Sequence, residues 1–383
     1  MRPKNYHIVL LAGEVSGDHH AARLIQALKK TGISFTLSGV GGSALKKEGM
    51  GTLIDSETLS VIGVSGVLRK LPIYYRALKT VRKALQETKP NILILVDFPD
   101  FNLLVAKTAK KLNIPVFYYI SPQIWAWRQG RVRKIQKRID HMAVILPFES
   151  DFYSSYHVPV TYVGHPLMDD EDFSIKNLPN ELCSEQTIGF LPGSRMSEIK
   201  THLPIMLDAA RMIQEKKPEI QFFLSIPNER QTDLIDQILT KKNAHELVRK
   251  ETKLTQVFKK SRILVAVSGT VTLQAAIWAI PTMIVYKSSW LNAVIGRLLI
   301  RVKFIGLANL IAQKKVMPEL IQEDVTAFNI YKQGIMWLSD NSALEKTQEE
   351  LLMIRKKIGE PGAAEKTARL ILKLLKVPIK SLL

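Results

Sequence analysis

Short apolar runs alternate with helix-like stretches along the chain, and this alternation restricts the possible fold more than any other feature. The first run, His7 to Leu11, is followed by a turn over residues 13–18 and then by apolar residues spaced for one helix face. The run "NILILVDFPDF", residues 91–101, shows no polar alternation, as expected for a strand buried on both faces. Strands that alternate with helices predict an α/β fold with parallel sheets and crossover helices.

One stretch, residues 263–286, contains no charged residue and is long enough to span a bilayer. The alternative is a buried strand, a turn at Ser268-Gly269-Thr270, a short buried helix, Pro281 and a second strand. Turn-forming residues stand where this alternative needs its turns. The sequence therefore favours a strand, a helix and a strand over a membrane span.

The alternation is interrupted over residues 167–186, which include a run of acidic residues, Pro179 and the single cysteine, Cys183. This composition predicts a linker. A second series of strands and helices follows, and each half repeats the order of strand, glycine turn with a charged residue, and helix. We therefore expect two Rossmann-like, doubly wound domains, residues 1–166 and 187–358, facing a central cleft. Ligands of such open sheets bind at the carboxyl ends of the strands.

The overall charge indicates an anionic partner. The 383 residues suit two domains, and 54 Lys and Arg against 35 Asp and Glu give a net charge of +19. Nucleic acid, a phosphorylated substrate or an acidic membrane surface would each fit such a charge. A single cysteine excludes an intrachain disulfide and a cysteine-based zinc site, and it is typical of a protein from a reducing cytoplasm. The 8 histidines form no metal-binding pattern, so no metal is predicted.

Two turns in the second half each end a strand and begin a helix. The sequence "LPGSR" carries Gly193, Ser194 and Arg195, and "VSGT" carries Ser268, Gly269 and Thr270. Main-chain N–H groups at a helix N-terminus attract phosphate, and an arginine can offer it two parallel hydrogen bonds. Either turn alone could be an ordinary helix cap without a ligand. Their occurrence in one domain, at the same sheet edge, favours a diphosphate ligand.

Two carboxylates in the first half are candidate catalytic groups. Asp97 ends a buried strand, where a charge requires a partner or exposure to solvent, and Glu14 lies in the turn after the first strand. Each could be a general base or orient a substrate, or could instead satisfy main-chain donors of its own turn. The neighbouring Asp100 could cap the next helix.

The motif "GVGGSA", residues 39–44, fits a dinucleotide-binding fingerprint, which would suggest a dehydrogenase. It follows the second strand, however, whereas the fingerprint usually follows the first. We therefore interpret it as a tight turn between a strand and a helix.

Three segments combine apolar or aromatic residues with Lys and Arg: residues 61–85, 121–138 and 290–306. The first and third suit an anionic membrane interface, and they also suit ordinary core packing with charges in water. The second carries two tryptophans and could bind nucleic acid or lipid headgroups, or be a solvated helix face behind buried tryptophans. No DNA- or RNA-binding module is visible, so no nucleic-acid partner is predicted.

Eight short sequences occur in a characteristic order over nearly the whole chain: "AGEVSGD", "DFPDFN", "SPQIWAWRQGRVRKI", "LPFE", "VGHP", "LPGSR", "SGT" and "LANLIAQKKVMPELIQ". Together they resemble the lipid-A-disaccharide synthase family. The resemblance implies a GT-B glycosyltransferase that transfers a sugar from UDP-2,3-diacylglucosamine to 2,3-diacylglucosamine 1-phosphate with inversion. The products would be the β-1,6-linked disaccharide phosphate and UDP.

The same resemblance implies that no metal or other cofactor takes part, since the UDP-sugar is itself a substrate. It implies a peripheral protein on the cytoplasmic face of the bacterial inner membrane. A terminal helix within residues 359–383 would return to the first domain, and some relatives form homodimers.

Four residues, Glu14, Asp97, Arg195 and Asn309, match positions that are important in that family. The resemblance implies that Asp97 is the base for the acceptor hydroxyl, with Glu14 as the reserve. Arg195 and the helix start at residues 268–270 would stabilise charge on the departing diphosphate. Asn309 would hydrogen-bond the nucleotide or the sugar.

Gln274 departs from the family pattern, because many relatives have a glutamate there that accepts hydrogen bonds from the ribose hydroxyls. Glutamine is a weaker acceptor, so a weaker ribose contact is expected. The nearest alternative function is another GT-B enzyme acting on UDP-N-acetylglucosamine, either an epimerase or a transferase. The apolar and basic segments favour the lipid-using enzyme, because an epimerase has no need of lipid.

Overall fold

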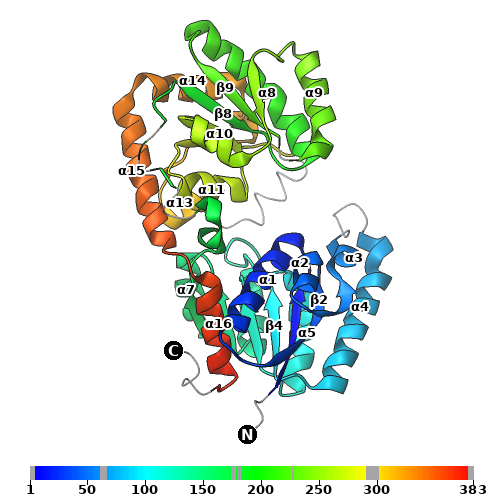
Figure 1. The fold of residues 1–383 in the computed structure, drawn as a ribbon. Coiled ribbons are helices and arrows are strands. Elements are labelled where there is room, and N and C mark those ends of the chain that lie inside the picture. Colours follow the sequence, from blue (N-terminus) through cyan, green and yellow to red (C-terminus); the bar gives the residue numbers. More distant parts are fainter. Residues whose placement is uncertain are drawn as a thin grey trace. The chain divides into compact units, whose positions relative to one another are not determined.

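A computed structural model describes residues 5–60, 67–173, 178–179, 181, 183–226, 228–289 and 302–377. The chain folds into two compact units (Figure 1). The first unit contains Met1–Asp169 and Pro361–Leu383, and the second contains Asp170–Glu360. The chain therefore passes from one unit to the other within the segment predicted as a linker, and its terminal segment belongs to the first unit.

The first unit is built on a parallel sheet whose described strands lie in the order β3-β2-β1-β4-β5-β6-β7. The strands are β1 (Tyr6–Ala12), β2 (Phe35–Gly41), β3 (Gly51–Asp55), β4 (Ile92–Val96), β5 (Val116–Tyr119), β6 (His141–Val144) and β7 (Val160–Tyr162). The strand order reverses between β1 and β4, which pair with Ala12 opposite Val96. Ligands of open parallel sheets bind at such a reversal, so the ends of β1 and β4 mark a candidate site.

Helices pack on both faces of this sheet. Alternate residues of β1 enter two separate hydrophobic cores, Val9 and Leu11 on one face and Ile8 and Leu10 on the other. The helices of this unit are α1 (Val15–Lys30), α2 (Ser43–Lys47), α3 (Ser56–Ser60), α4 (Val67–Thr88), α5 (Pro99–Lys111), α6 (Val132–Arg138), α7 (Pro147–Ser154) and α16 (Ala363–Leu374). The sheet is thus covered on both sides, as its apolar strands predict.

Helix α16 comes from the end of the chain and packs against α1 (Figure 1), where Ile371 joins the same buried cluster as Leu24. Asp169 accepts hydrogen bonds at the start of this helix, from the N–H groups of Gly362 (2.6 Å) and Ala363 (3.2 Å). A carboxylate is favourable at a helix N-terminus. These hydrogen bonds link Asp169, where the chain leaves the first unit, to the residues just after Pro361, where it returns.

The second unit has a parallel sheet whose described strands lie in the order β10-β9-β8-β11-β12-β13. The strands are β8 (Thr187–Leu191), β9 (Gln221–Ser225), β10 (Val248–Glu251), β11 (Ile263–Val267), β12 (Thr282–Tyr286) and β13 (Glu319–Ile321). The helices are α8 (Met196–Lys216), α9 (Thr232–Lys241), α10 (Leu254–Lys260), α11 (Thr270–Ile277), α13 (Leu307–Ala312), α14 (Ala327–Ser339) and α15 (Asn341–Ile358). Here the order reverses between β8 and β11, so the ends of these two strands form the corresponding candidate site.

The uncharged stretch 263–286 forms β11, α11 and β12, which confirms the prediction of a strand, a helix and a strand. None of the described helices is both long and apolar enough to cross a membrane. The two segments that suit either a membrane interface or core packing are described only in part, because residues 61–66 and 290–301 lie outside the described residues.

Candidate functional site

A pocket of about 420 Å³ lies in the second unit, at the carboxyl ends of β8, β9, β10 and β11. It brings together both turns that the sequence predicts to bind a diphosphate. The residues from these turns and the helices after them are Pro192, Gly193, Ser194, Arg195, Glu198, Ser268, Gly269, Thr270, Val271 and Gln274. The predicted UDP-binding residues other than Asn309 thus line one cavity.

The first turn requires glycine at position 193. Gly193 has a φ of +111°, and a Cβ there would lie only 2.5 Å from the Cβ of Glu198. The positive φ and this close approach both disfavour any residue other than glycine. The chain then passes through Ser194 and Arg195 into α8, with Arg195 as the residue before the first helical one.

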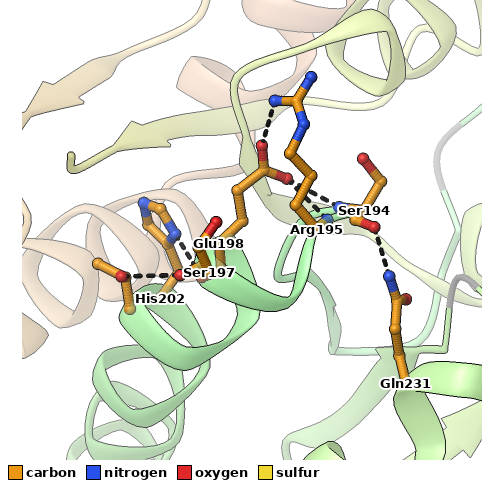
Figure 2. A network of polar contacts seen from close by, with 7 residues as sticks. Ser194, Arg195, Ser197, Glu198, His202 and Gln231 are labelled. Atoms are coloured by element: carbon orange, nitrogen blue, oxygen red, sulfur yellow. Dashed lines mark hydrogen bonds and ion pairs between the residues drawn. The ribbon is translucent and has the colours of Figure 1, made fainter. Parts of the chain in front are cut away.

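Glu198 is a pocket residue that the sequence analysis does not identify. Its Oε2 accepts hydrogen bonds from the main-chain N–H groups of Ser194 (2.9 Å) and Arg195 (3.2 Å), and its Oε1 accepts one from Nη1 of Arg195 (2.8 Å). Figure 2 shows the carboxylate between these donors. A glutamate three residues after a helix cap is the usual spacing of a capping box, and this spacing is the sequence signal that could have revealed it.

Two further residues form hydrogen bonds with the main chain of this turn and of the start of α8 (Figure 2). The side-chain amide of Gln231 donates a hydrogen bond to the carbonyl oxygen of Ser194. His202 donates from Nδ1 to the carbonyl oxygen of Glu198 (2.8 Å) and accepts at Nε2 from the N–H of Lys287 (2.9 Å). Burial lowers the pKa of His202, and these two contacts require the neutral ring with its proton on Nδ1.

The second turn leaves a helix N-terminus open to the pocket. Gly269 precedes α11 and provides no side-chain cap, and the first turn of this helix contains no acidic residue. At the other end of the helix, the buried Arg355 donates from Nε to the carbonyl oxygen of Ile277 (2.5 Å). The positive end of the helix dipole therefore faces the cavity, and the negative end is compensated by a cation. Gln274, one turn into the helix, is half-buried at the pocket wall.

The two candidate carboxylates of the first unit stand at the ends of adjacent strands. Asp97 directly follows β4, and Glu14 follows β1 by one residue and precedes α1. Glu14 is exposed, whereas Asp97 is half-buried. Burial and, to a lesser degree, the nearby charge of Glu14 raise the pKa of Asp97 to about 6, against the lowering effect of a main-chain hydrogen bond from Phe98.

The main chain at Asp97 has an unusual conformation. Asp97 and Phe98 both lie in the left-handed region, with φ values of 46° and 47°. The carbonyl oxygen of Asp97 accepts hydrogen bonds from Nδ2 of Asn102 (2.6 Å) and from the hydroxyl of Tyr118 (2.6 Å). Non-glycine residues are held in this region only where the surroundings fix them, and such strain clusters at functional sites.

The ring of Phe98 in turn lies against Gly13, where a Cβ would come within 2.4 Å of the ring. Because Gly13 has no side chain, the turn after β4 can pack against the turn that carries Glu14. The supporting residues Asn102 and Tyr118 were not predicted as site residues, although Asn102 belongs to the quoted motif "DFPDFN".

The motif at residues 39–44 is a tight turn between β2 and α2, as predicted. The N–H groups of Gly42 (2.7 Å), Ala44 (2.9 Å) and Leu45 (3.3 Å) all donate to the buried carboxylate of Asp18. The chain's own carboxylate thus occupies the position that a dinucleotide phosphate would take.

Asn309 does not join the other predicted site residues. It is fully buried, and its Nδ2 donates to the carbonyl oxygen of Met317 and to Oε1 of Glu319, both at 2.8 Å. Its Oδ1 accepts from the N–H groups of Val316 and Met317, also at 2.8 Å. All four hydrogen-bonding positions of the amide are used within the fold, which gives Asn309 a structural role, and its contact with the nucleotide or sugar stays a prediction.

The segment with two tryptophans divides into a buried and an exposed part. Trp125 is buried and donates from Nε1 to the buried Glu149 (3.0 Å), whereas Trp127 is 38% exposed. The guanidinium of Arg128 lies 4.2 Å from the centre of the Trp127 ring. Asp100, in the first turn of α5, forms an ion pair with Arg131 instead of serving as a helix cap.

The chain has two doubly wound parallel sheets, and the second has an arginine and an open helix N-terminus at its carboxyl edge. These features define a protein with the GT-B architecture of UDP-sugar enzymes. Solved structures that share this fold include an S. aureus MnaA-UDP co-structure, with a TM-score of 0.64, 12% identity and 98% coverage of each chain, and Acinetobacter baumannii MurG. The latter has a TM-score of 0.61 and 14% identity, with 97% of this chain and 100% of the other covered.

The chain belongs to the lipid-A-disaccharide synthetase family, whose profile matches residues 8–373. It is 37% identical over 379 residues to the lipid-A-disaccharide synthase of Geobacter sulfurreducens, covering 97% of this chain and 98% of that protein. It is 40% identical over 376 residues to the protein of the same name from Nitrosococcus oceani, covering 96% of each chain.

Proposed function

We propose that the protein is a lipid-A-disaccharide synthase. It transfers 2,3-diacylglucosamine from UDP to 2,3-diacylglucosamine 1-phosphate, and the products are the β-1,6-linked disaccharide 1-phosphate and UDP. The observation that carries this proposal is the pocket that unites Arg195 with the N-terminus of α11, in a chain matched by the family from residue 8 to residue 373.

The pocket of the second unit would bind the UDP part of the donor. Diphosphate oxygens would accept hydrogen bonds from the guanidinium of Arg195, from the main-chain N–H groups of Gly269 and Thr270, and from the hydroxyl of Ser268, whose own N–H donates to the carbonyl oxygen of Val285. Negative charge grows on these oxygens as the bond to the sugar breaks. The fixed dipole of α11 and the arginine would stabilise that charge more in the transition state than in the bound donor.

Asp97 would be the general base of the transfer. The acceptor's 6-hydroxyl attacks the anomeric carbon from the side opposite UDP, its proton passes to the Asp97 carboxylate, and the bond from that carbon to the diphosphate oxygen breaks. Inversion follows from this single displacement. A base whose pKa is about 6 is ionised at neutral pH and is a stronger proton acceptor than an ordinary aspartate. Glu14, next to it and exposed, is the alternative base.

The transfer would need no metal, because Arg195 and α11 would together supply the positive charge at the diphosphate. The enzyme would act as a peripheral protein on the cytoplasmic face of the inner membrane, where its acylated substrates lie. A net charge of +19 favours contact with that anionic surface.

The test is to incubate the purified protein with both acylated substrates in the presence of EDTA and to search for products by mass spectrometry. The proposal predicts the disaccharide phosphate and UDP in equal amounts, with a β-anomeric signal by NMR. UDP-N-acetylglucosamine in place of the acylated donor should be neither epimerised nor transferred. Epimerisation of that sugar, without any disaccharide from the acylated pair, would support the alternative GT-B enzyme.

A further inference from the structure

The pocket contains a negative charge where the proposed ligand is itself an anion. Among the lining residues that the structure describes, Arg195 is the one cation and Glu198 the one anion. The two form an ion pair of 2.8 Å between Nη1 and Oε1. A diphosphate that enters this pocket therefore meets an arginine that already has a partner.

Glu198 also occupies the main-chain donors of the turn. The N–H groups of Ser194 and Arg195 point at its Oε2, at 2.9 and 3.2 Å. These are the donors that a helix N-terminus offers to a phosphate. With the guanidinium, three donors that could serve a diphosphate are thus held by one carboxylate (Figure 2).

The two partners of this ion pair differ in their freedom to move. The side chain of Glu198 is 16% exposed, whereas that of Arg195 is 79% exposed. Glu198 lies against Gly193, where a Cβ would come within 2.6 Å of Oε2, and it caps the helix from within the first turn. Arg195 has no comparable packing, so the arginine is the partner that can turn away.

We propose that Glu198 is a resident anion that competes with the diphosphate for Arg195. Binding of the nucleotide transfers the guanidinium from Glu198 to the diphosphate, while Glu198 keeps its two main-chain hydrogen bonds. When the product UDP leaves, the carboxylate takes the arginine back. Glu198 is therefore a positioning residue that weakens UDP binding and aids its release. This inference rests on the proposed function, because it assumes that the pocket binds UDP.

The experiment is a calorimetric titration of three proteins, the unaltered chain, Glu198→Gln and Glu246→Gln, with UDP and with uridine. Glutamine still accepts hydrogen bonds at the turn but does not hold the arginine by charge. We expect Glu198→Gln to bind UDP about threefold to tenfold more tightly than the unaltered protein. Glu246 is exposed and does not line the pocket, so Glu246→Gln controls for net charge and should bind UDP as the unaltered protein does.

Uridine lacks the diphosphate, so its affinity should be the same for all three proteins. UDP affinity that is unchanged or weaker in Glu198→Gln would overturn the inference, as would an equal gain in Glu246→Gln. If the unaltered protein binds UDP and the variant shows no gain, only this inference fails. If none of the proteins binds UDP, the assignment of the pocket fails as well.

A second measurement follows Arg195 in the unaltered protein and uses a variant only to assign its signal. The arginine side chains are labelled with ¹⁵N, and the Arg195 signal is identified by its absence in Arg195→Ala. Addition of inorganic pyrophosphate should shift this signal, because Nη1 exchanges a carboxylate for a phosphate oxygen. A signal that does not move at saturating pyrophosphate would contradict the exchange.

Discussion

The side-chain amide of Asn102 donates a 2.6 Å hydrogen bond to the carbonyl oxygen of Asp97, the residue that directly follows β4. This contact, with the one from the hydroxyl of Tyr118, holds Asp97 in a left-handed conformation. The conformation turns the chain sharply at the end of the strand. The position of the proposed base is thus set by a buried amide five residues further along the chain.

Replacement of Asn102 should therefore disturb the base without touching the nucleotide pocket. We expect Asn102→Leu to lower stability by about 1 to 3 kcal/mol, since a hydrogen bond to a strained main chain is lost. The rate of disaccharide formation should fall, while UDP affinity measured by calorimetry stays unchanged. Tyr118→Phe removes only the second hydrogen bond and should show a smaller fall. A normal rate in Asn102→Leu would show that the turn keeps its shape without the amide.

The raised pKa of Asp97 predicts how activity depends on pH. The base must be ionised to accept a proton, so kcat/KM should rise with pH and level off above a midpoint of about 6. Glu14→Gln removes the nearby negative charge and should move this midpoint down. A profile that is flat between pH 5 and 8 would argue against Asp97 as the base.

Asp97→Asn should abolish transfer and at the same time stabilise the fold at neutral pH. The pKa is about 6 in the folded protein and roughly 3.9 in an unfolded chain. The folded state therefore holds its proton more tightly, and stability falls as the pH rises from about 4 through 6. Removal of this ionisation should stabilise the variant by on the order of 3 kcal/mol at pH 7. Asparagine tolerates the left-handed backbone, so thermal melting at pH 4 and pH 7 would measure the effect.

Asp18 should be important for stability and unimportant for nucleotide binding. Its buried carboxylate accepts three main-chain hydrogen bonds at the start of α2. Asp18→Ala leaves these donors without a partner and should destabilise the protein by about 2 to 4 kcal/mol in urea unfolding. UDP affinity should not change. Tight binding of NAD to the unaltered protein would contradict the interpretation of residues 39–44 as a self-capped turn.

Gln274→Glu should strengthen the ribose contact. Gln274 lines the pocket on the first turns of α11, where a carboxylate would accept hydrogen bonds from ribose hydroxyls more strongly than an amide does. We expect UDP to bind about threefold to tenfold more tightly. The 2′,3′-dideoxy form of UDP lacks these hydroxyls and should gain nothing. An equal gain for both nucleotides would place the effect elsewhere than at the ribose.

The regular parts of the fold could be predicted because they depend on local patterns. Unbroken apolar runs such as Ile92–Val96 indicate buried parallel strands, and the structure has them in two sheets. The turn residues of the stretch 263–286 were sufficient to distinguish a strand, a helix and a strand from a membrane span. Both follow from residue types within a few positions of one another.

Which group occupies the main-chain donors of each glycine turn could not be predicted in the same way. Three such turns look alike in sequence, but Asp18, which is 24 residues from Gly42, fills the first, Glu198 fills the second, and the third is open. The hydrogen-bond partners of Asn309 at residues 316–319 likewise become visible only when the loop after α13 folds back on it. Whether a polar group serves the fold or a ligand depends on tertiary contacts that no local pattern contains.

The central claim is that the cavity at Arg195 is the UDP site, and a calorimetric titration with UDP tests it most directly. Arg195→Ala is compared with the unaltered protein and with Arg249→Ala, which removes an exposed arginine that does not line the pocket. Loss of a charge-assisted contact predicts about tenfold or greater weakening in Arg195→Ala and no change in Arg249→Ala. Equal UDP affinity in all three proteins would contradict the account.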